Sequence, residues 1–153
     1  MNAQNLILKY LAEAKVLQLA TVGDDSRPWI SNVHFVSDKA GNIYWLSTEN
    51  RRHSIEIESN ENIAASIVVK SDMPVIGIQA EGIAEKVSDI AIIGRIMPSY
   101  VKKHGTGKEF YKRALAGIND HKLYRMKPSF YSLFDEVNFP KSAPQIWHIT
   151  KND

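Results

Sequence analysis

Two hydroxyl residues and three basic residues stand close together near the middle of the chain, in the segment STENRRH. Ser47 and Thr48 open this segment, and Arg51, Arg52 and His53 close it. Arginine binds phosphate through a fork of N–H groups, and the unpaired N–H groups at a helix start attract anions. If a strand ends at the hydroxyls and a helix begins at the arginines, these donors meet at one point. The segment therefore predicts a phosphate-binding corner between a strand and a helix.

The residues around this corner predict both elements. Asn42–Thr48 contains an apolar and aromatic run that is too short for a helix and typical of a strand. Tyr44 and Trp45 alternate along it, so we expect one side chain in the core and the other facing outward. Arg51–Ser59 is predicted to be a short helix, with Asn50 as the candidate for its N-cap.

A plainer interpretation of the same corner is a solvated helix start, in which the arginines pair with Glu56 and Glu58. Runs of charge on helices are more often solvated faces than binding sites. Taken alone, the corner favours this plainer interpretation. Support for phosphate binding has to come from the rest of the chain.

Length and composition exclude several classes of protein. The chain has 153 residues, enough for one domain with a sizeable core, and 44% of them are hydrophobic. A net charge of +2 argues against a nucleic-acid-binding protein, which would carry a concentrated basic face. The absence of cysteine excludes disulfides, thiolate metal sites and a cysteine nucleophile. It also fits a reducing compartment.

No apolar stretch is long enough to span a bilayer, and no signal-peptide pattern opens the sequence. We therefore expect a cytoplasmic protein without a membrane segment. The histidines lack the spacing of metal ligands, so no metal site is predicted; they are His34, His53, His104, His121 and His148.

Most of the chain is predicted to form strands joined by short turns. In chain order, strands are expected at 16–22, 29–37, 42–48, 63–69, 75–87, 123–126, 130–139 and 146–149, and helices at 2–15, 51–59, 88–100 and 109–116. Gly77 and Gly82 lie inside the long strand 75–87, where they suggest bulges or bends that let a sheet curl. This order predicts a mainly β fold with α (α+β), an antiparallel barrel with helices packed outside.

Three stretches along this order resemble the pyridoxamine 5′-phosphate oxidase-like family of flavin-binding split β-barrels. They are RPWISNVHFVSD at residues 27–38, NIYWLSTENRRHSIEIESNENIAASIV at 42–68 and GIQAEGIAEKV at 77–87. The resemblance implies one FMN-binding domain over residues 1–153, folded as a six- to seven-stranded antiparallel split β-barrel with peripheral helices. It also implies a homodimer that binds FMN at the subunit interface.

The resemblance also implies which residues would contact FMN. Those along the isoalloxazine ring would be Ser31, Asn32 and Val33, and those at the ribityl-phosphate end Ser47, Thr48, Arg51, Arg52 and His53. Gln79 and Trp147 would reach the flavin from the other subunit. His53 departs from the family, which commonly has a lysine there. A histidine is only partly charged near neutral pH, so phosphate binding is expected to depend on pH.

These observations lead to an FMN-dependent oxidoreductase acting on an unidentified small molecule. Because the flavin would carry the redox chemistry, no catalytic residue is singled out. The alternatives are a flavin-binding module without turnover, a barrel of this fold that binds haem or a deazaflavin, and a structural dimer without a chromophore. Haem would need an axial ligand, for which His34 and His148 are the candidates.

Overall fold

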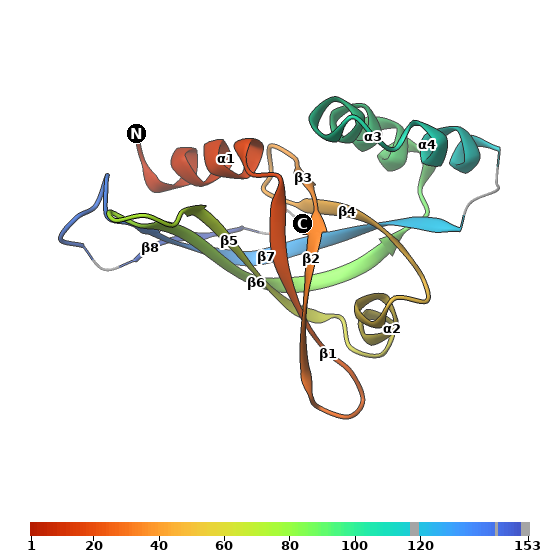
Figure 1. Cartoon of the computed structure of the whole chain (residues 1–153), viewed down its shortest axis with the longest axis horizontal. Helices are drawn as coiled ribbons and strands as arrows, with labels where there is room; N and C mark the ends of the chain where they lie inside the picture. The colour runs from red at the N-terminus through yellow and green to blue at the C-terminus, as the bar shows by residue number, and fades with distance from the viewer. Residues whose placement is uncertain (117–119, 143, 151–153) are drawn as a thin grey trace.

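A single antiparallel sheet forms the body of the molecule (Figure 1). The computed structural model describes residues 1–116, 120–142 and 144–150. Over these residues, the elements in chain order are α1 (Ala3–Glu13), β1 (Val16–Val22), β2 (Pro28–His34), β3 (Val36–Ser37), β4 (Ile43–Thr48), α2 (Arg52–Ser59), β5 (Asn62–Lys70), β6 (Ile76–Val87), α3 (Ile90–His104), α4 (Lys108–Leu115), β7 (His121–Asp135) and β8 (Gln145–His148).

The strands follow the order β2-β1-β5-β6-β7-β4-β3, and β8 pairs with β7. Every neighbouring pair is antiparallel. The sheet curls, with α1 over one end, α3 and α4 along one side, and α2 at the opposite end (Figure 1). This arrangement confirms the predicted split antiparallel barrel with peripheral helices. Among the described helices, none is long and apolar enough to cross a membrane.

Two separate apolar clusters hold the sheet in place. The larger cluster fills the inside of the curl and includes Trp45 and the buried face of α1. The smaller cluster lies where α3 and α4 pack on the outer surface of the sheet, and it includes Tyr44 and Met97. Tyr44 and Trp45 are both fully buried. The prediction that one of them faces outward is therefore wrong, because α3 covers the face that the alternation assigns to solvent.

Strand β7 runs without a break from His121 to Asp135, although two shorter strands are predicted on either side of Pro128. The register between β6 and β7 shifts between Glu81 and Gly82, and Gly82 pairs with Pro128. This irregularity accommodates a proline, which has no N–H for a regular ladder. The predicted bulge at Gly82 is confirmed, and it explains why the strand continues.

Two other element boundaries differ from prediction. The expected strand 29–37 is divided at Phe35, whose N–H donates to the Lys15 carbonyl at 3.2 Å instead of continuing the β-ladder. Helix α3 continues past Pro98 to His104, where Gly105 ends it in the left-handed conformation. The longer helix brings His104 next to β2, since its ring lies 5.0 Å from that of His34.

The Gly82 bulge leaves no room for a side chain. A Cβ there would collide with the Lys127 carbonyl oxygen and lie 2.7 Å from Pro128 Cα, whereas a Cβ at Gly77 would have its nearest neighbour at 3.8 Å. We expect Gly82→Ala to lower the free energy of unfolding by about 2–3 kcal/mol. The matched Gly77→Ala variant should stay within about 1 kcal/mol of the wild type. Equal losses in urea unfolding would contradict this account of the bulge.

Candidate functional site

A cleft of about 530 Å³ opens between β2, the end of β4 and the start of α2. Eight of the ten residues predicted to bind a cofactor line it: Ser31, Asn32, Val33, Ser47, Thr48, Arg51, Arg52 and His53. The structure thus brings the strand residues of β2 and the β4–α2 corner to one place, as the sequence analysis expects.

The turn from β4 into α2 leaves the helix start without a side-chain cap. Arg51 occupies the N-cap position and its side chain makes no capping hydrogen bond. The predicted cap, Asn50, is wrong: its Oδ1 accepts a hydrogen bond from the Thr48 hydroxyl at 2.6 Å. First-turn N–H groups have no acceptor within their own helix, so an uncapped start is a site that an anion can occupy.

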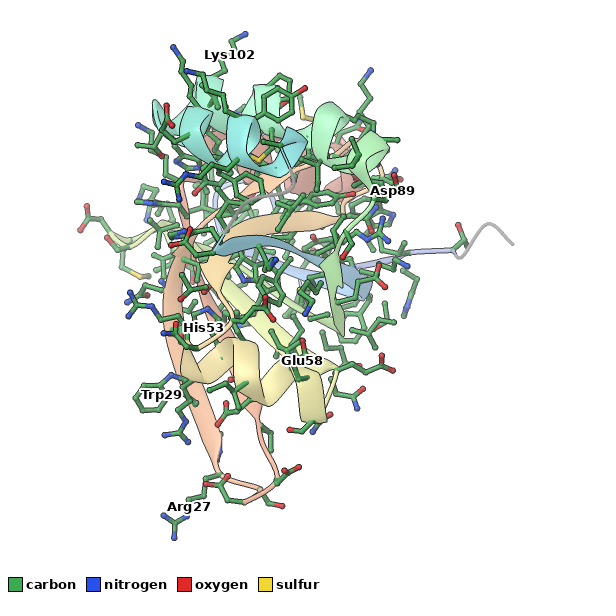
Figure 2. The ribbon with its side chains drawn as sticks, turned by 90° about the vertical axis from the view of Figure 1, so that its right-hand side faces the viewer. Arg27, Trp29, His53, Glu58, Asp89 and Lys102 are labelled. Atoms are coloured by element: carbon green, nitrogen blue, oxygen red, sulfur yellow. The ribbon has the colours of Figure 1, made fainter. Side chains whose placement is uncertain are left out.

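His53 joins the two strands that line the cleft. Its Nε2 lies 2.8 Å from the Ser47 hydroxyl of β4, and its Nδ1 lies 3.2 Å from the Ser31 hydroxyl of β2. The side chain is buried at the start of α2 (Figure 2). Burial lowers the pKa of this imidazole, and the nearby Arg51 guanidinium lowers it further, while Glu56 opposes the shift. His53 is therefore neutral near pH 7, with one ring nitrogen as donor and the other as acceptor.

Arg52 is held in place by a buried carboxylate and an aromatic ring. Its Nε donates to Glu56 at 2.8 Å, and its guanidinium lies 4.2 Å from the centre of the Trp29 ring. Glu56, whose side chain is 8% exposed, also accepts a hydrogen bond from the buried Thr21 hydroxyl at 2.5 Å. The charge of Arg52, whose side chain is 43% exposed, is thus balanced by a buried carboxylate, and its position is fixed on two sides.

Arg51 carries the uncompensated positive charge at this corner. Among the described residues, its guanidinium has no ion pair and no hydrogen bond to a side chain. It lines the cleft beside Thr48 and His53 and is exposed to solvent. The plainer interpretation, in which both arginines pair with glutamates, therefore holds for Arg52 alone.

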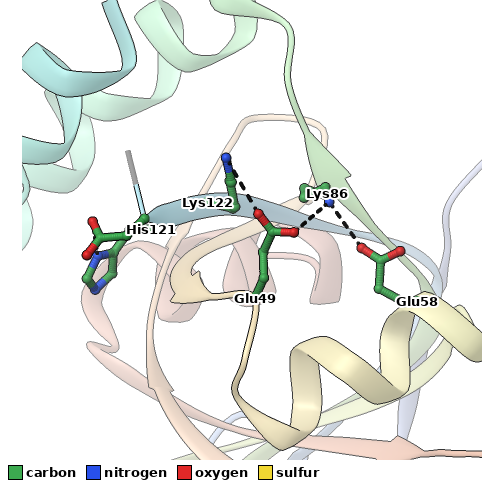
Figure 3. A network of polar contacts seen from close by, with 6 residues as sticks. Glu49, Glu58, Lys86, His121 and Lys122 are labelled. Carbon is green, nitrogen blue, oxygen red and sulfur yellow. Dashed lines mark hydrogen bonds and ion pairs between the residues drawn. The ribbon is translucent and has the colours of Figure 1, made fainter. Parts of the chain in front are cut away.

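Glu58 and Glu49 are paired away from the cleft. Lys86 Nζ of β6 lies 3.2 Å from both carboxylates, and Lys122 of β7 lies 3.5 Å from Glu49 (Figure 3). These partly exposed pairs tie α2 and the β4–α2 turn to the sheet. They also keep the carboxylate of Glu49, which precedes the basic residues, engaged with two lysines.

Two predicted residues do not line this cleft. Gln79 is exposed in the middle of β6, between Ser66 and Ser132 of the neighbouring strands. Trp147 of β8 stacks on Tyr131, with the ring centres 5.6 Å apart. Both were expected to act from a second subunit, and that role stays a prediction.

Four cleft residues were missed by the sequence analysis: Trp29, Leu46, Tyr100 and His121. His34 also lines the cleft, and the sequence analysis names it as a candidate ligand of haem. Trp29 lies two positions before Ser31 on β2, so the period of two in a strand was a signal that would have found it. Tyr100 and His121 come from α3 and β7, far away in the sequence. No local pattern connects them to the corner.

The donor set fits a ligand that carries a phosphate or a similar anion. An uncapped helix start, the unpaired Arg51 guanidinium and the Thr48 hydroxyl lie together, and apolar and aromatic residues line other parts of the same cleft. Within the described part of the chain, no three His, Asp or Glu side chains are close enough to hold a metal ion.

Comparison with known families identifies the chain. A model of the pyridoxamine 5′-phosphate oxidase family matches residues 4–131. The chain belongs to this family. The resemblance drawn from the sequence is thereby confirmed. A search of curated protein sequences finds no match to the chain.

Solved structures of low sequence identity share the fold of this family member. A putative pyridoxamine 5′-phosphate oxidase from Listeria innocua has a TM-score of 0.68 at 19% identity, over 87% of this chain and 98% of that one. HutZ, the haem storage protein from Vibrio cholerae, has a TM-score of 0.67 at 23% identity, over 88% and 95%. A haem-binding protein from Mycobacterium smegmatis has a TM-score of 0.76 at 13% identity, over 97% and 59%.

The buried carboxylate of Glu56 can be tested against an exposed one on the same helix. Glu56→Ala leaves the Thr21 hydroxyl buried without its acceptor and frees Arg52, so we expect a loss of about 1–3 kcal/mol in the free energy of unfolding. Glu58→Ala removes a carboxylate that is 59% exposed and should cost about 0.5 kcal/mol or less. Chemical unfolding of both variants measures the difference, and equal effects would refute the clamp on Arg52.

Proposed function

We propose that the chain binds FMN in the cleft beside α2 and works as an FMN-dependent oxidoreductase on a small molecule. The observation that carries this proposal is the uncapped start of α2 next to the unpaired Arg51. Membership of the pyridoxamine 5′-phosphate oxidase family supports flavin as the ligand. A cleft of about 530 Å³ also lies within the usual range of small-molecule sites.

In this proposal, the residues divide between the two ends of the flavin. The phosphate would take N–H groups of the α2 start and the Arg51 guanidinium. The Thr48 hydroxyl would turn from Asn50 to donate to the phosphate. Ser31, Asn32 and Val33 of β2 would support the isoalloxazine ring. Bound FMN supplies hydride or electron transfer, and the protein contributes binding and orientation.

We further propose that two copies of the chain complete the site as a homodimer. β2 is an end strand of the sheet order, and it exposes Trp29 and Ile30 by 42% and 65% beside the cleft. Exposed apolar side chains on an edge strand are typical of a surface that a partner covers. Gln79 and Trp147 would then approach the ring from the second subunit.

Visible absorption tests the cofactor directly. The purified protein, alone and after addition of FMN, should show flavin bands that elute with a dimer on size-exclusion chromatography. Arg51→Ala removes the unpaired guanidinium, so we expect FMN to bind about tenfold or more weakly, since charge-assisted hydrogen bonds contribute about 1.5–3 kcal/mol.

Two controls separate phosphate binding from loss of the fold. Arg95→Ala changes an exposed arginine of α3 that does not line the cleft and should leave FMN affinity unchanged. Riboflavin has no phosphate and should bind Arg51→Ala as it binds the wild type. A wild-type protein that binds neither flavin would rule out the cofactor. Binding without reduction by any added electron donor would favour a flavin-binding module without turnover.

Haem is a second candidate, favoured by one observation in the cleft. His34 is exposed and lines it, so its imidazole is available as an axial ligand. The fold is shared with a haem storage protein and a haem-binding protein. If haem binds there, titration with hemin should give a Soret band that His34→Ala shifts or abolishes. The same change at His148 on β8, outside this cleft, is the control. No Soret shift in either variant would exclude His34 as the ligand.

A further inference from the structure

We propose that His53 makes phosphate binding at this corner proton-linked: the imidazole takes up a proton as a phosphate dianion enters beside Arg51. His53 thereby sets how strongly the cleft prefers a phosphorylated ligand over the same ligand without its phosphate. This inference rests on the proposed function in assigning the start of α2 to phosphate. The inference goes beyond the proposed function because it gives His53 control over the preference for a phosphorylated ligand.

The position of the ring supports a role in binding as well as in packing. His53 lies in the first turn of α2, two residues after Arg51, and it lines the cleft. Its two nitrogens face hydroxyl groups, at 2.8 Å for Ser47 and 3.2 Å for Ser31. A hydroxyl can donate or accept. Both serines can therefore turn to accept when the imidazole becomes a double donor, and no hydrogen bond is lost on protonation.

Burial first, and the charge of Arg51 second, hold the ring neutral while the corner is free of anions. On α2, Arg51 opposes protonation and Glu56 favours it, but Glu56 is already paired with Arg52. Ser31 on β2, Ser47 on β4 and Ser54 on α2 are uncharged. The other ionisable residues of the cleft are His34, Tyr100 and His121, and Lys86 on β6 is paired with Glu49 and Glu58.

A phosphate at the corner reverses this balance. It would screen Arg51 and place negative charge near the ring, and an opposite charge within a few ångströms raises the pKa of an imidazole. If the pKa is low in the free protein and higher in the complex, the complex binds more protons between the two values. Affinity for phosphate must then rise as the pH falls through that window. The affinity levels off below the pKa that His53 has in the free protein.

The first test needs no flavin, and it uses an altered protein only to assign the His53 signal. The imidazole signals of the chain are followed by NMR as a function of pH, in inorganic phosphate and in chloride of equal ionic strength. The His53 signal is identified by its absence in His53→Gln. We expect phosphate to raise the pKa of His53 by about one unit or more. An unchanged pKa for His53 would overturn the proposal.

The second test compares FMN with riboflavin between about pH 6 and pH 8, since the second ionisation of a phosphate monoester lies near pH 6. The ratio of the two affinities should rise several-fold toward pH 6 in the wild type, since one pKa unit of difference gives about tenfold at most. In His53→Gln and His53→Lys this ratio should vary only with the ionisation of the phosphate itself. His53→Lys should also have the higher ratio of the two variants at pH 8.

The two tests distinguish failure of this inference from failure of the proposed cofactor. FMN that binds the wild type with the same pH dependence as His53→Gln refutes the proton linkage and leaves the cofactor standing. A His53 pKa that rises in phosphate, in a protein that binds no flavin, refutes FMN and leaves a proton-linked phosphate site.

Discussion

His53 contacts one serine of β2 and one serine of β4, and these strands are not hydrogen-bonded neighbours in the sheet. The order of strands leaves the curl open between them, so something other than a β-ladder must set their separation. A buried ring with a donor on one side and an acceptor on the other fixes both strands relative to α2. The width of the cleft depends on these contacts, and the residues on its two walls are positioned by them.

The two adjacent arginines differ in their partners, although both are exposed. Arg52 contacts Glu56 and Trp29, so its charge is balanced and its guanidinium is fixed. Arg51 has no such partner among the described residues, so it alone adds positive charge to the corner. Leaving a buried carboxylate without its partner costs free energy, so Glu56 stays paired with Arg52. Arg52 thus orders the helix start from which Arg51 and His53 act.

The sequence was sufficient for the parts of the site that are close together along the chain. Thr48 and Arg51 are joined by one short turn, so a local pattern predicted the corner. The residues of β2 in the cleft, Ser31, Asn32 and Val33, were implied by the family resemblance. Features that depend on packing were not predictable in this way. Tyr44 is buried because α3 covers it, and Tyr100 reaches the cleft from that same helix. Asn50 does not cap α2 as predicted, because its side chain accepts a hydrogen bond from the Thr48 hydroxyl instead.

Strand β2 runs along the cleft, so its length gives the distance between the two ends. At one end Trp29 stacks with Arg52 beside the start of α2, and at the other His34 lies against His104 of α3. The five residue steps from Trp29 to His34 span about 16 Å at the usual rise of a strand. Tyr100, on the same helix as His104, lines the α3 end, and its ring lies 4.8 Å from that histidine. The cleft therefore has the arginines with Trp29 at one end and an aromatic end without arginine, formed by Tyr100 and His34, at the other. This separation is compatible with the proposed elongated ligand, which has a phosphate at one end and a flat ring at the other. A small free anion would satisfy only the first end, which is why the aromatic end favours a cofactor over a simple phosphate ion.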